Sequence, residues 1–376
     1  MFTIKNKKGK ARAGELSLPH GVIQTPFFMP IATKGAVKGL DSNDLLSLGA
    51  QIVLSNTYHL FLRPGQEEMK KMGGLHKFMN WNRPILTDSG GYQVFSLSKI
   101  NKTTENGVIF KSYIDGKNLE LTPEISMAMQ AAIGSDIIMQ FDDVAAGNSD
   151  YDRYKDAMER SLRWAKRCLQ SYDKSQKIFG IVQGGIHWDL REFSAKELMK
   201  LPFDGYAIGG LSVGEPRPQA FEMTKKTCEI LPPDKPRYFM GGGMPEEIVY
   251  YVSVGVDMFD CVLPTRNARH GSLFLWAEEP AKAVEKAFLL AHEEATDMQI
   301  ADALYRKVQI TSSVYVEDTT PIDIFGPKSS QKYTKAYLRH LLRINEILGY
   351  RLATLQNLGF YLRLMAELRK IISSTK

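Results

Sequence analysis

The chain has 376 residues, of which 44% are hydrophobic and 24% charged, and its formal net charge is +6. This composition is that of a globular protein, and the length suits a large barrel better than one small domain. No uncharged apolar run reaches 18 residues, and the start, MFTIKNKKGKARAG, lacks the apolar core of a signal peptide, so we expect no membrane partner and a location in the reducing cytosol. The cysteines Cys168, Cys228 and Cys261 are too widely spaced for a disulfide framework or a metal site.

Eight short apolar runs follow one another along the chain, and each ends in glycine or a polar residue. They begin at Val22, Gln51, Pro84, Asp136, Ile178, Gly205, Arg237 and Val256. Stretches with helical spacing separate most of them, for example those from Thr122, Tyr154 and Pro245. Apolar strands that alternate with amphipathic helices predict an α/β fold with a parallel sheet covered by helices. Eight units favour a closed (β/α)8 TIM barrel over its rival, an open doubly wound sheet.

Several of the expected strands end in a polar side chain or a glycine. These end positions are Asn56, Asp88, Asp142, Asp143, Gln183, Gly210, Met240 and Asp260. In a barrel, the carboxyl ends of the strands share one mouth, where catalytic groups lie. A single aspartate there often only caps a helix. Three strands that bring carboxylates to the same mouth favour a functional site instead.

The regular alternation stops after residue 276. The segment from Ala277 to Lys307 has helical spacing and mixed charge, and helical spacing returns from about Tyr333 to the end. We therefore expect a barrel over residues 1–276, a helical insertion over 277–307, and the end of the barrel with a helical C-terminal subdomain over 308–376. From Phe325 onward there are ten Lys and Arg against two Glu. This excess fits either a solvated helix face or a phosphate-facing patch.

Two of the carboxylates suit glycosidic chemistry, which needs one group to attack the anomeric carbon and another to move protons. Asp260 and Asp88 end the eighth and third expected strands, so they can face each other across a barrel mouth. Arg266 and Arg269 follow Asp260 closely, where they could hold the phosphates on either side of a nucleotide.

The remaining polar groups at the mouth suit a planar heterocycle. A carboxylate such as Asp142 is a natural partner for the paired N–H groups on the Watson–Crick edge of guanine. Tyr92 and Met240 could enclose the two faces of the ring. The set that we expect to bind the base is Asp142, Gln183, Gly210, Leu211, Tyr92 and Met240.

Four motifs, LTDSGGYQVFSL, GIVQGG, YAIGGLSVGE and DMFDCVLPTRNAR, in this order, resemble the tRNA-guanine transglycosylase family. The resemblance covers about residues 2–275 and resumes from about residue 308. It implies a (β/α)8 barrel pentosyltransferase that exchanges the wobble guanine of certain tRNA anticodons for a 7-deazaguanine base in queuosine synthesis. It further implies a cytoplasmic homodimer.

The resemblance also implies a role for individual residues. Asp260 is similar to the nucleophile that links covalently to the ribose, and Asp88 to the general acid/base. Thr265, Arg266 and Arg269 match contacts to the anticodon loop. Two alternatives stay open: a non-catalytic tRNA-binding partner subunit of the same family, which the presence of both aspartates disfavours, and a glycoside hydrolase, which would leave the base-binding set unexplained.

The sequence departs from the bacterial pattern of the family at its zinc site. Members usually carry a Cys-x-Cys-x-x-Cys loop and a later His. Here those four positions hold Phe325, Pro327, Ser330 and Gln356, none of which is a good zinc ligand. We therefore expect no metal and no cofactor. We also expect Phe325 to pack against the C-terminal helices and so to fix the loop in place of the metal.

Two further departures concern the incoming base and the chain length. Val144 stands where bacterial members have Cys, as in the eukaryotic form that takes the bulkier queuine, whereas Val213 is of the bacterial type. Val144 favours queuine and Val213 favours the prequeuosine base, so the choice between the two bases stays open. The segment from Ala277 is an insertion relative to the family.

Overall fold

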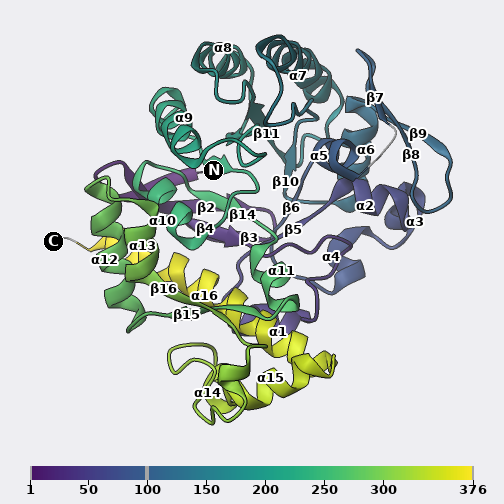
Figure 1. The fold of residues 1–376 in the computed structure, drawn as a ribbon. Coiled ribbons are helices and arrows are strands. Elements are labelled where there is room, and N and C mark those ends of the chain that lie inside the picture. Colours follow the sequence, from purple (N-terminus) through teal and green to yellow (C-terminus); the bar gives the residue numbers. More distant parts are fainter. Residues whose placement is uncertain (1, 98–100, 375–376) are drawn as a thin grey trace.

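The computed structural model describes residues 2–97 and 101–374 and contains a barrel of eight parallel strands (Figure 1). These strands are β4 (Phe27–Met29), β5 (Val53–Ser55), β6 (Ile85–Thr87), β10 (Ile137–Met139), β11 (Lys177–Val182), β12 (Gly205–Ile208), β13 (Arg237–Phe239) and β14 (Met258–Asp260). From β5 each strand pairs in parallel with the next, and β14 pairs with β4. A parallel bridge between Ile31 and Leu54 closes the seam between β4 and β5. The prediction of a closed barrel is confirmed.

Side chains alternate between the barrel interior and the helical layer outside. On β14, Met258 belongs to the smaller apolar cluster formed by alternate strand residues, and Phe259 to the larger cluster beneath the helices. Because the strand period is two, Asp260 points inward again and Cys261 outward. Cys261 is buried in the larger cluster and also borders the pocket at the barrel mouth.

Helices cover the outside of the barrel, and several of them have side-chain caps at their amino ends. In α6, for example, the Thr122 side chain accepts from Ile125 N–H at the start and Gly134 ends the helix in the left-handed region. The helices that lie between barrel strands are α1 (Ser42–Ser47), α2 (Thr57–Leu62), α3 (Gln66–Lys71), α4 (Gly74–Met79), α5 (Gly91–Leu97), α6 (Pro123–Ile133), α7 (Tyr151–Ser171), α8 (Trp188–Met199), α9 (Arg217–Ile230) and α10 (Pro245–Ser253), and α11 (Leu263–Arg269) follows β14.

Among the described residues, two three-stranded antiparallel sheets lie outside the barrel. The first contains β1 (Phe2–Lys8), β2 (Ala11–Leu18) and β3 (Gly21–Thr25), and the second contains β7 (Asn101–Thr103), β8 (Val108–Lys111) and β9 (Asn118–Leu121). The apolar run from Val22, predicted as one strand, is divided between β3 and β4. Pro26 separates them because it has no N–H with which to continue the ladder.

The segment after the barrel strands is partly as predicted. Helices α12 (Pro280–His292) and α13 (Asp297–Leu304) occupy most of residues 277–307. The prediction was wrong for Tyr305–Lys307, which begin β16 (Tyr305–Gln309) and pair antiparallel with β15 (Ser272–Trp276). The ladder to β15 overrides the helical spacing at this end. A short 3-10 turn, η1 (Ser313–Tyr315), follows.

The chain ends in three helices, α14 (Lys328–Lys332), α15 (Lys335–Arg343) and α16 (Ile347–Ser373). The long α16, yellow in Figure 1, packs against α11, β1 and β4, and Arg369 donates to the carbonyl of Pro26 at 2.7 Å. The end of the chain therefore supports the first barrel strand. Among the described residues, no helix has the length and apolar content needed to cross a membrane.

Candidate active site

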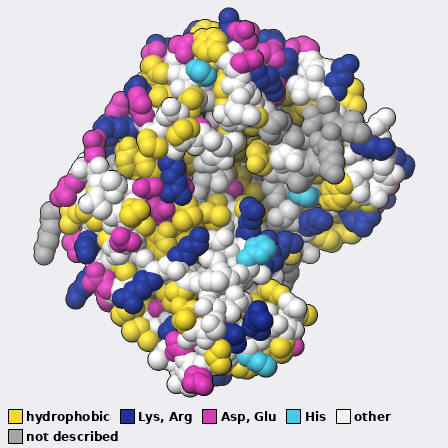
Figure 2. All heavy atoms as spheres, in the orientation of Figure 1, with side chains coloured by type: hydrophobic (Ala, Val, Ile, Leu, Met, Phe, Trp, Pro, Cys, Tyr) yellow, Lys and Arg dark blue, Asp and Glu magenta, His cyan; other side chains and the backbone are white. Residues whose placement is uncertain are grey.

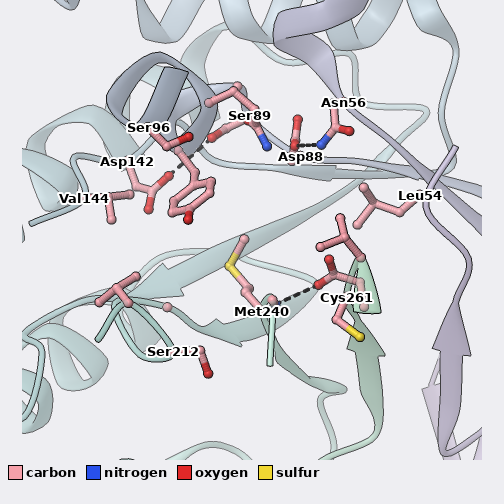
Figure 3. A pocket seen from close by; sticks show the side chains of 18 of the residues that line it. Leu54, Asn56, Asp88, Ser89, Ser96, Asp142, Val144, Ser212, Met240 and Cys261 are labelled. Atoms are coloured by element: carbon pink, nitrogen blue, oxygen red, sulfur yellow. Dashed lines mark hydrogen bonds between the residues drawn. The ribbon is translucent and has the colours of Figure 1, made fainter. Parts of the chain in front are cut away.

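A pocket of about 390 Å³ opens at the carboxyl ends of the barrel strands. This volume is within the range of small-molecule sites. Figure 3 shows Asp88, Ser89 and Asp142 along one wall, with Met240 and Cys261 along the facing wall. The pocket brings together all the residues predicted to act on or bind the base: Asp88, Tyr92, Asp142, Gln183, Gly210, Leu211, Met240 and Asp260.

Asp260 is held rigidly at the end of β14. Its Oδ1 accepts from the Tyr238 hydroxyl at 2.5 Å and from Gly241 N–H at 2.9 Å. Burial raises the pKa of Asp260, although these two hydrogen bonds oppose the rise. Within the described part of the chain, the second carboxylate oxygen accepts no hydrogen bond, so it is available to an incoming electrophile.

Asp88 follows β6 and is bound from the neighbouring strand end. Asn56 Nδ2 donates to Oδ2, and Thr57 N–H donates to Oδ1 at 2.8 Å. Burial raises the pKa of Asp88 to about 6, and the negative charge of Asp260 adds to the rise. The two carboxylates thus interact electrostatically, and Asp88 can give or take a proton near neutral pH.

Asp142 lies at the end of β10, within a hydrogen-bonded group. Ser89 Oγ donates to it at 3.2 Å and Gln183 Nε2 at 2.7 Å. Burial raises the pKa of Asp142 to about 7, with these hydrogen bonds opposing and the neighbouring Asp143 charge adding to the rise. The group offers carboxylate and amide atoms to one edge of a planar ligand.

The loop after β12 presents main-chain groups to the pocket. Gly210 has φ +64°, and a Cβ there would lie 2.4 Å from Gln183 Oε1, so a substitution would strain the backbone and displace the Gln183 amide. Glu215 accepts from the N–H groups of Ser212 and Val213. Because the carbonyl and N–H of one trans peptide point in opposite directions, the Leu211 carbonyl faces away from Glu215.

Other pocket walls are apolar or aromatic. Tyr92, on α5, is 49% exposed, and Met240 is partly buried. Val144 and Val213 also line the pocket. His59 lines it too, and burial together with Lys34 and Lys38 lowers the pKa of His59 to about 4, so its imidazole is neutral at pH 7.

The residues predicted to contact tRNA lie outside the pocket lining, on α11. Arg266 is exposed, and among the described residues neither it nor Arg269 has a carboxylate within 4 Å. Arg269 donates to the Thr265 carbonyl at 3.0 Å. Figure 2 shows Lys and Arg side chains in the middle of the face that carries α11. Two arginines that form no ion pair with a described carboxylate therefore lie beside the pocket mouth.

One carboxylate at a strand end turns away from the pocket. Asp143 receives two hydrogen bonds from Arg153, at 2.9 and 2.6 Å, and one from Arg160 at 2.5 Å. Its backbone N–H donates to Ser161 Oγ. Asp143 thus fixes the loop that carries Asp142 and is not itself a pocket group.

Sequence reasoning did not identify the groups that hold the carboxylates. Tyr238 lies inside an apolar strand and looks like a core residue, and Gly241 acts through its main chain. The role of Asn56 could have been inferred from the sequence, because Asn56 ends an apolar strand as the aspartates do. Ser89 stands directly beside Asp88 in the sequence and had no separate signal.

The four positions that match the zinc site do not fit zinc. Gln356 Nε2 donates to the Phe274 carbonyl at 2.8 Å and to Asp323 Oδ2 at 2.9 Å. Pro327 packs against Gly359 of α16. The prediction that Phe325 fixes this loop was wrong, because its side chain is 37% exposed. The hydrogen bond from Gln356 of α16 to Asp323 holds the loop instead.

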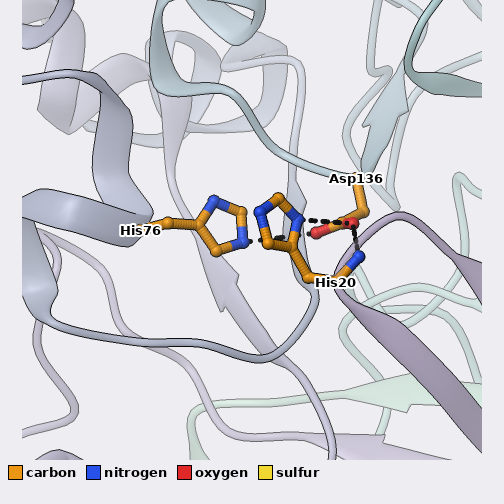
Figure 4. Close-up of side chains that lie close together, drawn as sticks. All are labelled: His20, His76 and Asp136. Atoms are coloured by element: carbon orange, nitrogen blue, oxygen red, sulfur yellow. Dashed lines mark hydrogen bonds and ion pairs between the residues drawn. The ribbon is translucent and has the colours of Figure 1, made fainter.

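A group of possible metal ligands lies just before β10 (Figure 4): His20, His76 and Asp136. His20 Nδ1 is 2.9 Å from Asp136 Oδ1, and His76 Nε2 is 3.4 Å from Oδ2. The two rings stack, with centroids 3.6 Å apart and planes at 16°. Stacked rings direct their lone pairs side by side and not toward one ion, so this geometry indicates a hydrogen-bonded link between three segments.

Comparisons with known proteins give one result over the whole chain. The family model described as "Queuine tRNA-ribosyltransferase" matches residues 7–376. Queuine tRNA-ribosyltransferases of Vibrio cholerae (strain O395) and Vibrio campbellii are each 46% identical to this chain, over all of it and 93% of the relative. That of Aliivibrio salmonicida is 45% identical, over all of this chain and 94% of the relative.

Proposed function

Because this chain belongs to the queuine tRNA-ribosyltransferase family and is therefore a tRNA-guanine transglycosylase, we propose that it exchanges the base through a covalent intermediate on Asp260. One observation carries this proposal. An inward-facing carboxylate, fixed by Tyr238 and Gly241, stands beside a second carboxylate whose pKa is about 6. This is the pair of groups that a double displacement at an anomeric carbon needs.

The proposed reaction has two displacements. In the first, a carboxylate oxygen of Asp260 bonds to C1′ of the ribose, and the C1′–N9 bond breaks with its electron pair on guanine. Asp88 helps to protonate the departing ring nitrogen. In the second, the incoming base gives its ring N–H proton to the Asp88 carboxylate, its nitrogen bonds to C1′, and the C1′–O bond breaks with its electron pair on Asp260. Two easier substitutions replace one difficult one, and the kinetics are ping-pong.

The base is proposed to lie with its Watson–Crick edge against the Asp142 group. The ionised carboxylate of Asp142 accepts from the paired N–H groups, while the Gln183 amide and Gly210 N–H face the neighbouring carbonyl oxygen. Tyr92 and Met240 cover the faces of the ring. The same edge is present in guanine and in a 7-deazaguanine, so one site serves the leaving and the incoming base.

The incoming base is proposed to be a 7-deazaguanine, either prequeuosine base or queuine. Leu211 supports this class, because its carbonyl is turned away from Glu215 and can accept from an amine substituent on the base. Val144 and Val213 border the space around such a substituent. Competition between the two bases for exchange into tRNA separates the alternatives.

The anticodon loop is proposed to lie across α11, with Thr265, Arg266 and Arg269 at its phosphates. Lys34 and Lys38, close enough to shift the pKa of His59, add positive charge at the pocket rim. We further propose a homodimer in the cytoplasm. The exposed apolar side chains of Ile344 and Ile347 support an interface on the C-terminal subdomain. Sedimentation at several protein concentrations tests the dimer.

The nucleophile is tested by Asp260→Asn, which keeps the shape of the side chain but cannot form the ester. The parent protein is expected to form a tRNA adduct that survives a denaturing gel when no incoming base is present, and the variant is expected to form none. Asp204→Asn, which alters a carboxylate at the amino end of β12, is the matched control and is expected to retain exchange. Labelled guanine entering tRNA at a substantial rate in Asp260→Asn would remove Asp260 from this role.

A further inference from the structure

Arg191 is a buried arginine that no step described above uses. It lies near the amino end of α8, its side chain is fully buried, and it is absent from the pocket lining. Its guanidinium donates to the Gly209 carbonyl at 2.8 and 3.1 Å and to the Val182 carbonyl at 3.4 Å. Among the described residues, no carboxylate lies within 4 Å of it, and the negative charge of Glu215 acts on the cation only from a greater distance.

Keeping this cation inside the protein is costly. Burial lowers the pKa of Arg191 to about 10, which leaves the group charged at neutral pH. A positive charge near the amino end of a helix is also opposed by the helix dipole. A neutral donor could satisfy the same carbonyls without the desolvation of a charge. The presence of a charged side chain at this position, where a neutral donor would cost less, therefore requires an explanation.

The peptide that Arg191 contacts reaches into the pocket. The Gly209 carbonyl and the Gly210 N–H belong to one planar trans peptide, so they point in opposite directions. Arg191 stands on the carbonyl side, while Gly209 and Gly210 line the pocket. Within the described residues, the Gly210 N–H meets no protein acceptor, and glycine leaves no side chain over it.

We propose that Arg191 is a positioning residue that polarises the Gly209–Gly210 peptide, so that the Gly210 N–H stabilises the carbonyl oxygen O6 of the bound guanine. This inference rests on the proposed function, because it assumes the base orientation given there. When the C1′–N9 bond breaks, its electron pair stays on guanine and the negative charge spreads to O6 before the ring is protonated. A fixed donor backed by a buried cation favours that anion over the neutral base.

The test compares guanine with 6-thioguanine, which keeps the N–H groups of the same edge but replaces O6 by sulfur, a weaker acceptor. Inhibition constants of both bases are measured for the parent protein, Arg191→Gln and Arg191→Lys. The parent is expected to prefer guanine. Arg191→Gln, which retains N–H donors but loses the charge, is expected to lower that preference about 3- to 10-fold and to lower kcat for guanine exchange more than KM. Arg191→Lys is expected to restore part of the preference for guanine and part of kcat.

Arg237→Gln is the matched control. Arg237 is also buried and also donates to main-chain carbonyls, of Leu231 and Gly255, but it lies at the amino end of β13, away from the pocket. Its loss is expected to lower the melting temperature without changing the preference for guanine. A purely structural role for Arg191 would give the same result in both variants.

Three outcomes would overturn the inference: a parent protein with no preference for guanine, an Arg191→Gln variant with the parent's preference, or an Arg237→Gln variant that loses it. If the proposed function itself were wrong, the Asp260→Asn variant would still exchange the base. If Arg191→Gln does not fold, the C6=O stretching frequency of bound guanine is compared between the parent and Arg191→Lys. A smaller shift to low frequency in the lysine variant supports the inference, and identical frequencies contradict it.

Discussion

Asp142 illustrates a conflict between folding and binding at a single residue. Folding favours its protonated form, because burial raises its pKa to about 7. The binding mode that we propose for guanine needs the ionised form, because only the carboxylate can accept from two N–H groups. The residue therefore holds a charge that lowers stability for the sake of recognition.

The pH dependence of stability follows from the direction of this shift. The folded-state pKa lies above the unfolded value, so the group's contribution to stability is complete below about pH 4 and is lost as the pH rises through 7. The melting temperature of the parent is expected to fall relative to Asp142→Asn by about 2 °C per pH unit between pH 5 and 7. Thermal melts across this range measure the difference, and a constant difference would contradict the assignment.

Ionisation of Asp142 lowers the stability of the protein, but it is expected to strengthen base binding. Guanine binding to the parent should strengthen as the pH rises from 5.5 to 7.5, because Asp142 ionises over this range. Asp142→Asn should bind guanine more weakly, with less change over the same interval. Inhibition constants at each pH measure both. If the two proteins share one pH profile, another group governs binding.

At the residue scale, the sequence predicted the carboxylates that the pocket brings together, and it missed the groups that hold them. Asp88, Asp142 and Asp260 could be found because a carboxylate that ends an apolar strand interrupts the pattern of its neighbours. Tyr238 could not, because an aromatic residue in a buried strand usually belongs to the core. Arg191 looks in the sequence like any surface cation of an amphipathic helix, and only its burial in the fold sets it apart.

At the scale of the elements, the loop between η1 and α14 is held by hydrogen bonds at the positions that match the zinc site of the family pattern. Asp323 accepts from Gln356 and from the N–H of Trp276, which ties the loop to α16 and β15 together. Gln356→Ala would leave a buried carboxylate and the Phe274 carbonyl without this donor. We expect a loss of about 3 kcal/mol in the free energy of unfolding.

Denaturant titration measures the effect of Gln356→Ala, and hydrogen exchange over residues 321–335 locates it. Phe325→Ser is the comparison, and its effect is expected to be small because Phe325 is 37% exposed. A chelator is expected to leave the melting temperature of the parent unchanged. Stoichiometric zinc in the purified protein would contradict this account of the loop.

The elements were predictable where local pattern and tertiary pairing agree. All eight barrel strands were found because both of their faces are buried and their residues are continuously apolar. Strand β16 was not, since its helical spacing continues that of α13 and only the ladder to β15 makes it a strand. The sheet of β7, β8 and β9 has short, partly polar strands, which give little periodic signal.

At the scale of the whole molecule, the free cations beside the pocket predict salt-sensitive tRNA binding. Each phosphate contact releases counterions, so the logarithm of affinity should fall linearly with the logarithm of salt concentration. Arg266→Ala is expected to reduce the slope by about one unit and to leave base affinity unchanged. Arg163→Ala is the control, because Arg163 is paired with Glu105 at 2.7 Å. Equal slopes in the parent and Arg266→Ala would place the tRNA elsewhere.

The packing of α16 against β4 has a consequence for biosynthesis. The first barrel strand leaves the ribosome early, but its lasting neighbours are β14 and a helix that includes the last described residues. At about 5–20 residues per second, β4 waits on the order of 15–65 s for them. During that interval the apolar side chain of Phe28, which lies in the outer apolar cluster and contacts Tyr361 of α16 with ring centroids 4.9 Å apart, has no permanent cover. The nascent chain is therefore expected to need chaperone protection until α16 has been translated, and a stop codon before α16 should yield insoluble protein even though Asp88 and Asp260 have been made.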